Sequence, residues 1–200
     1  MITRTVSKHE VPRRALGPSL LVAMGLLLTG CSDEDDTSAE APNTTVRCAH
    51  DVLEPDLEAG DPVGPAVDPE SGKLRLERGE TYMVSSTYGT PKPGADGKPV
   101  MDRYYELFGA IQTQLESQPG LLALWLSQSP ACGSGRTLAV WKSEELMYDF
   151  VVSPPHLAAM NAVEDVLQPG YAVTHWEAST AEQVTFDEAV RQLAKAGVSP

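Results

Sequence analysis

The chain has 200 residues, with 15 lysines and arginines against 28 aspartates and glutamates, so its formal net charge at pH 7 is −13. Four of the basic residues and one acidic residue lie in residues 1–30. Without that segment the chain has 11 basic and 27 acidic residues and a formal charge of −16. An acidic surface repels phosphate backbones and anionic lipid head groups, which argues against nucleic-acid binding and electrostatic docking on membranes.

Residues 1–31 have the three-part pattern of a bacterial export signal. Basic residues at positions 4, 8, 13 and 14 precede an apolar run at 20–28. Nine helical residues extend only about 14 Å, too short for a hydrocarbon core of about 30 Å. The run ends in Leu28-Thr29-Gly30-Cys31, which resembles the lipobox of lipoprotein signal peptides. An ordinary cleaved signal with a chance cysteine is the alternative.

A lipobox makes residues 1–30 a removable signal peptide and Cys31 a lipidated N-terminus. Two or three acyl chains, at about 0.8 kcal/mol per buried methylene, anchor a chain firmly in a lipid membrane. We therefore expect a cell-envelope lipoprotein that faces the periplasm or the exterior. In an envelope with two membranes, Ser32 favours sorting to the outer membrane, although Asp33 weakens that signal.

The next segment, residues 31–79, is predicted to be an acidic, proline-rich tether. It contains five prolines and the acidic run 33–36, whereas all three tryptophans, six tyrosines and three phenylalanines lie between Tyr82 and Phe186. A stretch with no aromatic residue and many charges and prolines cannot bury enough apolar area to offset the entropy of ordering its backbone. The pattern therefore predicts one folded domain at 80–200, to which residues 73–76 add at most a short strand.

Cys48 and Cys132 remain once Cys31 is lipidated. Two leftover cysteines in an oxidising compartment usually form a disulfide. A bridge across 84 residues would restrict the unfolded chain by about 4.5 kcal/mol in the loop-entropy model. Two free thiols, or pairing with another chain, are the alternatives.

Within the domain, the patterns alternate between strand and helix. Residues 82–88 are predicted to be a strand, 89–100 a flexible glycine- and proline-rich loop, and 102–118 a helix with apolar residues every three or four positions. Strands at 121–127 and 137–141 form a hairpin. A helix at 143–150 is broken by Pro154-Pro155 and continues as a second piece capped by Ser153. A strand at 171–178 precedes a helix that begins with a capping box at 185–188 and ends at 196.

This order is the ferredoxin-like βαββαβ plan: an α+β fold with a four-stranded antiparallel sheet, both helices on one face, and an extra C-terminal helix. Alternation along the strands predicts which side chains lie on the face without helices: Ala123, Trp125, Ala139, Trp141, Thr174 and Trp176. A sheet face with three tryptophans is too apolar to remain exposed to solvent, so we expect a partner sheet, a ligand, or both to cover it.

The segment 137–160 resembles the antibiotic biosynthesis monooxygenase-like family of dimeric α/β-barrel proteins. The matching features are an aliphatic strand ending in Trp141, the Ser-Glu-Glu helix start at 143–145, Phe150, the Ser-Pro-x-His step at 153–156, and the Ala-Met pair at 159–160. The resemblance covers about residues 80–178. It implies a homodimer with two sheets packed face to face and a substrate cavity between sheet and helices. Members serve as oxygenases, as haem degraders, or have no known activity.

The haem-degrading branch of that family carries a tryptophan and an iron-ligating histidine where this chain has Phe150 and Met160. The resemblance therefore argues against haem degradation. His50, His156 and His175 lack metal-ligand spacing, so neither a metal nor a cofactor is predicted.

The candidate catalytic residues are His156 and Tyr88. An imidazole can transfer a proton near neutral pH, but His156 could equally brace the kink after Pro154-Pro155. Trp125, Trp141 and Trp176 could line a ligand pocket, or simply fill the core or an interface.

Two functions remain open from the sequence. In the first, the chain is a membrane-anchored lipoprotein whose domain binds a small hydrophobic ligand or serves in assembly, without catalysis. In the second, it is a cofactor-independent, monooxygenase-like enzyme acting on a small aromatic or quinone-like substrate through His156 and Tyr88.

Overall fold

The computed structural model describes residues 46–95 and 101–196. The predicted signal peptide, the lipidation site Cys31, the first part of the predicted tether and part of the 89–100 loop lie outside these residues. All described residues belong to one compact unit, which spans Asn43–Pro200. None of the described helices is long and apolar enough to cross a membrane.

The core of the domain is one antiparallel sheet. Its strands are β1 (Glu58–Ala59), β2 (Tyr82–Gly89), β3 (Leu121–Ser129), β4 (Ser134–Trp141) and β5 (Ala172–Ala178). Their order across the sheet is β1-β3-β4-β2-β5, and every neighbouring pair is antiparallel. The four long strands have the ferredoxin-like order, which confirms the predicted fold class. The short edge strand β1 is an addition that the sequence did not predict.

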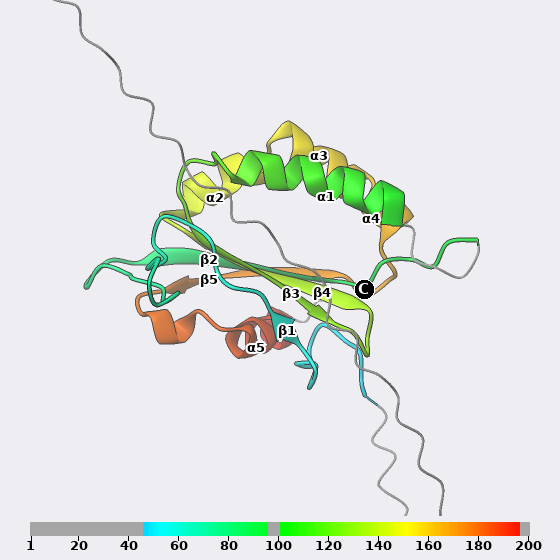
Figure 1. The fold of residues 1–200 in the computed structure, drawn as a ribbon, viewed down its shortest axis with the longest axis horizontal. Coiled ribbons are helices and arrows are strands. Elements are labelled where there is room, and N and C mark those ends of the chain that lie inside the picture. Colours follow the sequence, from blue (N-terminus) through cyan, green and yellow to red (C-terminus); the bar gives the residue numbers. More distant parts are fainter. Residues whose placement is uncertain (1–45, 96–100, 197–200) are drawn as a thin grey trace, which may run out of the picture. The chain divides into compact units, whose positions relative to one another are not determined.

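The helices lie on both sides of the sheet (Figure 1). The helices are α1 (Met101–Leu115), α2 (Glu144–Val151), α3 (Pro154–Asn161), α4 (Val163–Val166), a 3-10 turn η1 (Ala181–Gln183) and α5 (Phe186–Ala196). Helices α1 to α4 cover one face of the sheet, and α5 lies against the other. The predicted cap of α2 is present, because the amide of Leu146 donates a hydrogen bond to Ser143 Oγ over 3.3 Å.

The tryptophans do not share a face, so the predicted set of side chains on the face opposite α1 is partly wrong. Trp125 pairs with Leu138, and Trp176 pairs with Val84, on the face that α5 covers. Trp141 and Ala139 instead point toward α1 and α2, where the Trp141 ring stacks on Phe150 at 5.2 Å. Strand pairing register decides which positions of two strands share a face, and a one-residue difference reverses the assignment.

Residues 46–79 belong to the domain, so the predicted tether ends earlier than residue 79. We call residues 46–76 the strap. Its β1 pairs with β3, and the amide of Ala66 donates to the carbonyl of Leu122 over 2.9 Å. Leu74, in the segment expected to add a short strand, forms an isolated bridge with Val67. The strap has no aromatic residues, yet its Val67, Leu74 and Leu76 pack on the sheet.

The strap and α5 together cover the sheet face that carries Trp125 and Trp176. Trp176 is only 8% exposed, and Ala189 and Leu193 of α5 are fully buried. Trp176 is therefore buried by the same chain, and Trp125 is partly buried by it. The homodimer remains a prediction, but this face no longer provides the reason for it.

Candidate functional site

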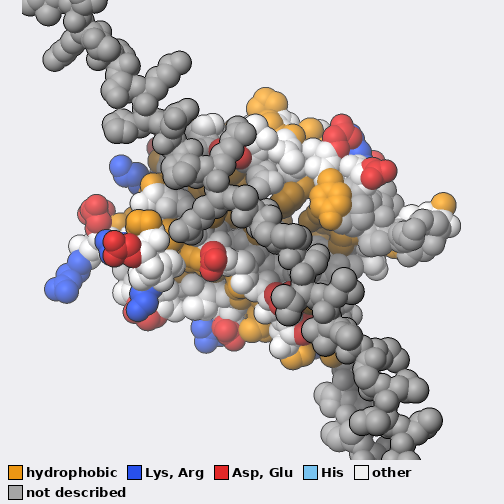
Figure 2. All heavy atoms as spheres, viewed as in Figure 1, with side chains coloured by type: hydrophobic (Ala, Val, Ile, Leu, Met, Phe, Trp, Pro, Cys, Tyr) orange, Lys and Arg blue, Asp and Glu red, His pale blue; other side chains and the backbone are white. Residues whose placement is uncertain are grey.

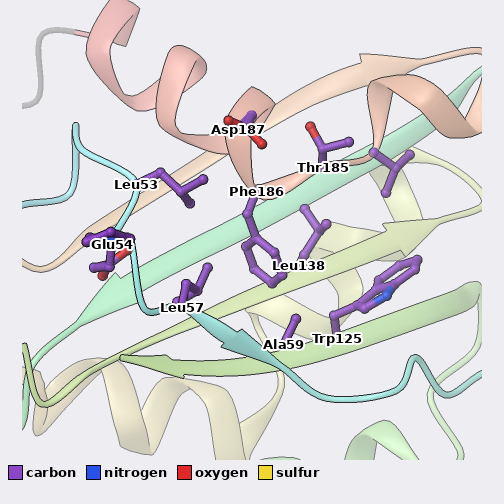
Figure 3. A pocket seen from close by; sticks show the side chains of 11 residues that line it. Leu53, Glu54, Leu57, Ala59, Trp125, Leu138, Thr185, Phe186 and Asp187 are labelled. Atoms are coloured by element: carbon purple, nitrogen blue, oxygen red, sulfur yellow. The ribbon is translucent and has the colours of Figure 1, made fainter. Parts of the chain in front are cut away.

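An apolar pocket of about 500 Å3 lies between the strap, the sheet and the start of α5 (Figure 3). It is lined by Leu53, Glu54, Pro55, Leu57, Ala59, Trp125, Leu138, Val184, Thr185, Phe186 and Asp187. Most of these side chains are hydrocarbon or aromatic, and the volume lies within the range of small-molecule sites, about 300–1,000 Å3. The site is therefore suited to an apolar ligand.

The strap wall of the pocket is held in place by a buried ion pair. Arg136 Nε donates to Glu54 Oε2 over 2.8 Å, and the hydroxyl of Ser134 donates to the other carboxylate oxygen over 2.7 Å. The two remaining guanidinium nitrogens donate to strap carbonyls: those of Ala49, His50 and Val52. Because Glu54 lies between two lining residues of the strap, this network positions the wall.

Two further links fasten the strap to the turn between β3 and β4. Cys48 and Cys132 form a disulfide, the pairing expected from the sequence. The carboxylate of Asp56 accepts hydrogen bonds from the Ser129 hydroxyl and the Ala131 amide, each over 2.7 Å. The hydrogen bond from Ser129, followed by that from Ala131, lowers the pKa of Asp56 below its usual value.

The opposite wall is the beginning of α5. Thr185 caps this helix by accepting a hydrogen bond from the amide of Glu188 over 3.0 Å, as the capping-box pattern predicts. Phe186 and Val184 flank the cap and pack into the cluster on this sheet face. The cap thus fixes the direction in which the Phe186 ring points into the pocket (Figure 3).

The three predicted ligand-binding tryptophans take different positions. Trp125 lines the pocket. Trp176 lies in the same apolar cluster but does not line the pocket, and its indole N–H donates to the Gln183 carbonyl over 3.1 Å. Trp141 is on the other face, where its indole N–H donates to Ser85 Oγ over 2.9 Å. The structure therefore places one of the three at the candidate site.

The two predicted catalytic residues lie on opposite sides of the sheet. His156 is in the helical layer: its Nδ1–H donates to the Val151 carbonyl over 3.0 Å, and its ring lies 4.7 Å from that of Phe150. Partial burial lowers the pKa of His156, and the hydrogen bond to Val151 opposes this shift. Tyr88 is buried under the Arg136 guanidinium, whose central carbon lies 4.6 Å from the ring centre. The two side chains do not form a common site.

Tyr88 instead lines a second, more polar cavity of about 490 Å3 beside the disulfide. Its walls include His50, Thr90, Gln168 and both cysteines, and Arg47 and Asp51 form an exposed ion pair there. Within residues 46–95 and 101–196, no three histidine, cysteine, aspartate or glutamate side chains are grouped so that they could hold a metal ion.

Sequence reasoning missed most of the pocket because its strap residues looked like part of a tether. Leu53 and Leu57 lie among acidic residues and prolines, and a low apolar content is normally a sign of disorder. A usable signal was present, however. Cys48 precedes these leucines closely, and its pairing with Cys132 brings them to the sheet.

No protein-family model matches this chain, and no curated protein matches it. Several solved structures are similar to it over about half of its length. Rv0793 from Mycobacterium tuberculosis is 20% identical, and the match covers 48% of this chain and 92% of that one at a TM-score of 0.41. A candidate antibiotic biosynthesis monooxygenase from Nitrosomonas europaea is 15% identical, with coverage of 52% and 94% and a TM-score of 0.41.

SnoaB, a cofactor-independent oxygenase from Streptomyces nogalater, is 15% identical, with coverage of 50% and 93% and a TM-score of 0.36. The similar structures thus include monooxygenase-like proteins, and also a protein of unknown function from Nitrosomonas europaea. The fold assignment rests on this chain's own strand order, and the activities of these proteins are not transferred to it.

Proposed function

We propose that this chain is a cell-envelope lipoprotein, anchored through Cys31, whose domain binds a small hydrophobic ligand in the pocket between strap, sheet and α5. The observation that supports ligand binding is the lining itself. Leu53, Leu57, Trp125, Leu138 and Phe186 line this open pocket, while the ion-paired Glu54 carboxylate is fully buried and already engaged. Transfer of apolar ligand surface into such a site is favourable by about 25 cal/mol per Å2.

The enzyme alternative has less support from the arrangement of side chains. Acid–base catalysis needs a donor or base within hydrogen-bond reach of the reacting atom. His156 and Tyr88 lie on opposite faces of the sheet, and the pocket lining contains neither a histidine nor a cysteine. We therefore favour binding without catalysis.

Ligand binding is tested with the neutral fluorophore N-phenyl-1-naphthylamine, since an acidic protein would repel the usual anionic dyes. The protein is the exported chain, residues 31–200, carrying Cys31→Ser so that it stays free of lipid. We expect saturable enhancement of the dye's fluorescence, with energy transfer from Trp125 at the pocket wall. The absence of saturable binding would refute the ligand-binding function.

The strap supplies a matched pair of variants for this experiment. Ala59 lines the pocket and is exposed, whereas the adjacent Glu58 does not line it, because neighbouring strand residues point to opposite sides. Ala59→Phe should fill the pocket and weaken dye binding at least tenfold. Glu58→Phe adds the same ring outside the pocket and should leave the affinity within about twofold.

Anchoring is tested separately in the producing cell. Full-length protein should fractionate with membranes, and Cys31→Ser should release it to the soluble fraction, because removal of the thiol removes the site of acylation. Ser32→Ala is the control, since it leaves the cysteine intact. Retention of the Cys31→Ser protein on membranes would contradict anchoring through a lipid.

A further inference from the structure

The polar groups of the pocket define what its ligand can be, and this step rests on the proposed function. The Glu54 carboxylate is buried and engaged by Ser134 and Arg136, while Thr185, which accepts a hydrogen bond from the amide of Glu188, is half-buried at the start of α5. A polar ligand group placed against Leu53, Leu138 and the Phe186 ring would lose its water without gaining a hydrogen-bond partner. The buried part of the ligand is therefore hydrocarbon.

The shape of the lining fits a chain. The apolar side chains follow the strap from Leu53 past Leu57 and Ala59 to Trp125, with Phe186 and Leu138 facing them (Figure 3). A single hydrocarbon chain laid along this row would contact the strap on one side and the Phe186 ring on the other.

The second charged group at the pocket, after Glu54, is the carboxylate of Asp187, which is exposed. None of the described residues forms a salt bridge with it. The positive end of the α5 dipole does not call for an external anion, because Asp187 and Glu188 already occupy the first turn. With a formal charge of −16 on the exported chain, the rim disfavours anionic head groups.

We propose that the pocket binds the single hydrocarbon chain of an amphiphile whose head group is cationic or neutral and remains outside, next to Asp187. This excludes fatty-acid anions as preferred ligands. It also separates the buried chain, which supplies the affinity, from the head group, which supplies the selectivity.

The experiment measures displacement of N-phenyl-1-naphthylamine from the exported Cys31→Ser chain by alkyltrimethylammonium ions with 8, 10, 12 and 14 carbons, below their micelle concentrations. At about 0.8 kcal/mol per buried methylene, each added methylene should tighten binding about fourfold until the pocket is full. Alkyl carboxylates of equal length should bind at least fivefold more weakly, and alkyl maltosides should fall between the two.

The head-group contact is tested with Asp187→Asn, which should bring the cationic series to the affinity of the maltosides without changing the dependence on chain length. Asp149→Asn removes an exposed carboxylate from α2, on the other face, and should change neither series. Displacement that does not depend on chain length, or carboxylates that bind as tightly as the cations, would overturn the proposal.

Two outcomes separate this proposal from the proposed function. If the dye binds and Ala59→Phe abolishes its binding, but no amphiphile displaces it, the pocket is a ligand site and the amphiphile assignment is wrong. If the dye does not bind, both are wrong. Phosphatidylcholine vesicles form a final arm: sedimentation of the chain with vesicles, without displacement by free amphiphile, would show recognition of a bilayer surface and overturn the single-chain assignment.

Discussion

Arg136 and Glu54 form an ion pair in which both side chains are fully buried, with 2.8 Å between Nε and Oε2. The two residues are 82 positions apart in the chain and join β4 to the strap. Burial of a charge pair is costly unless its remaining donors and acceptors are also satisfied. The strap supplies three carbonyls to the guanidinium, so the pair and the conformation of the strap depend on each other.

Glu54→Gln should therefore destabilise the domain strongly. It leaves the Arg136 charge buried without a counter-ion, a change that typically costs about 3–5 kcal/mol. Urea unfolding of the exported Cys31→Ser chain measures the difference. Asp51→Asn, which breaks the exposed pair with Arg47, is the control and should change the free energy of unfolding by less than about 1 kcal/mol. Equal effects of the two variants would mean that the buried pair is not a structural link.

Arg136→Lys tests the geometry of the same link. A lysine retains the charge but cannot direct several planar donors to Glu54 and three carbonyls at once. We expect circular dichroism close to that of the wild type, because the sheet retains its other contacts, but weaker dye binding as the strap wall loosens. Unchanged dye affinity would show that the pocket wall does not depend on Arg136.

The disulfide should stabilise the domain through the 84-residue loop that it closes. The loop-entropy model gives about 4.5 kcal/mol, and measured values for natural disulfides are commonly about 2–5 kcal/mol. The Cys48→Ser/Cys132→Ser variant should unfold at lower urea and become insensitive to reductant, whereas the parent chain should lose stability on reduction. A parent chain whose unfolding midpoint does not change with reductant would contradict this role.

The βαββαβ core was predictable because each element carries a local signal. The helix at α2 follows from Ser143 and its acidic first turn. Pro119-Gly120 indicates that α1 must stop, although the helix ends at Leu115, three residues before the predicted end. These signals depend on a few neighbouring residues. They are therefore visible without knowledge of the fold.

The pocket was not predictable in the same way, because it depends on contacts between distant segments. The position of Trp141 follows from the pairing of β3 with β4, which includes an irregularity between Leu121 and Ala123. The strap is ordered by Arg136, 82 residues after Glu54, and nothing near Glu54 indicates that its charge will be buried. Of the predicted site residues that the structure describes, only Trp125 lines the pocket, since register rather than residue type decides the face.

His156 should make stability depend on pH below neutrality. Its pKa is lowered in the folded state, mainly by burial, so protonation favours the unfolded chain. Its stabilising contribution is complete above the unfolded pKa of about 6.5 and is lost as the pH falls from there through the lower folded pKa. NMR titration of the imidazole should give a pKa below 6.5, and His156→Gln should remove this component from the pH profile of unfolding. Dye binding at neutral pH should be unchanged, since His156 lies on the face away from the pocket.

Helix α5 should act as the cover of the sheet face that carries Trp125 and Trp176. Leu193 of this helix is fully buried. Shortening a buried leucine to alanine typically lowers the free energy of unfolding by about 2–5 kcal/mol. Leu193→Ala should therefore lower the urea midpoint and shift tryptophan fluorescence to longer wavelength as α5 detaches. Leu157→Ala is the matched control. Leu157 of α3 is 45% exposed, so its loss should be tolerated. Hydrophobic side chains are indeed visible at the surface of the domain in Figure 2.

The same experiment determines whether a second copy is needed to cover this face. If the strap and α5 suffice to cover this face and no homodimer forms, the unfolding midpoint of the wild type is independent of protein concentration, because no association is coupled to folding. Leu193→Ala should instead associate at intermediate urea, detectable by sedimentation velocity, since its sheet face becomes exposed. A wild-type midpoint that rises with protein concentration would show that a partner subunit stabilises the fold and that the cover from α5 is incomplete.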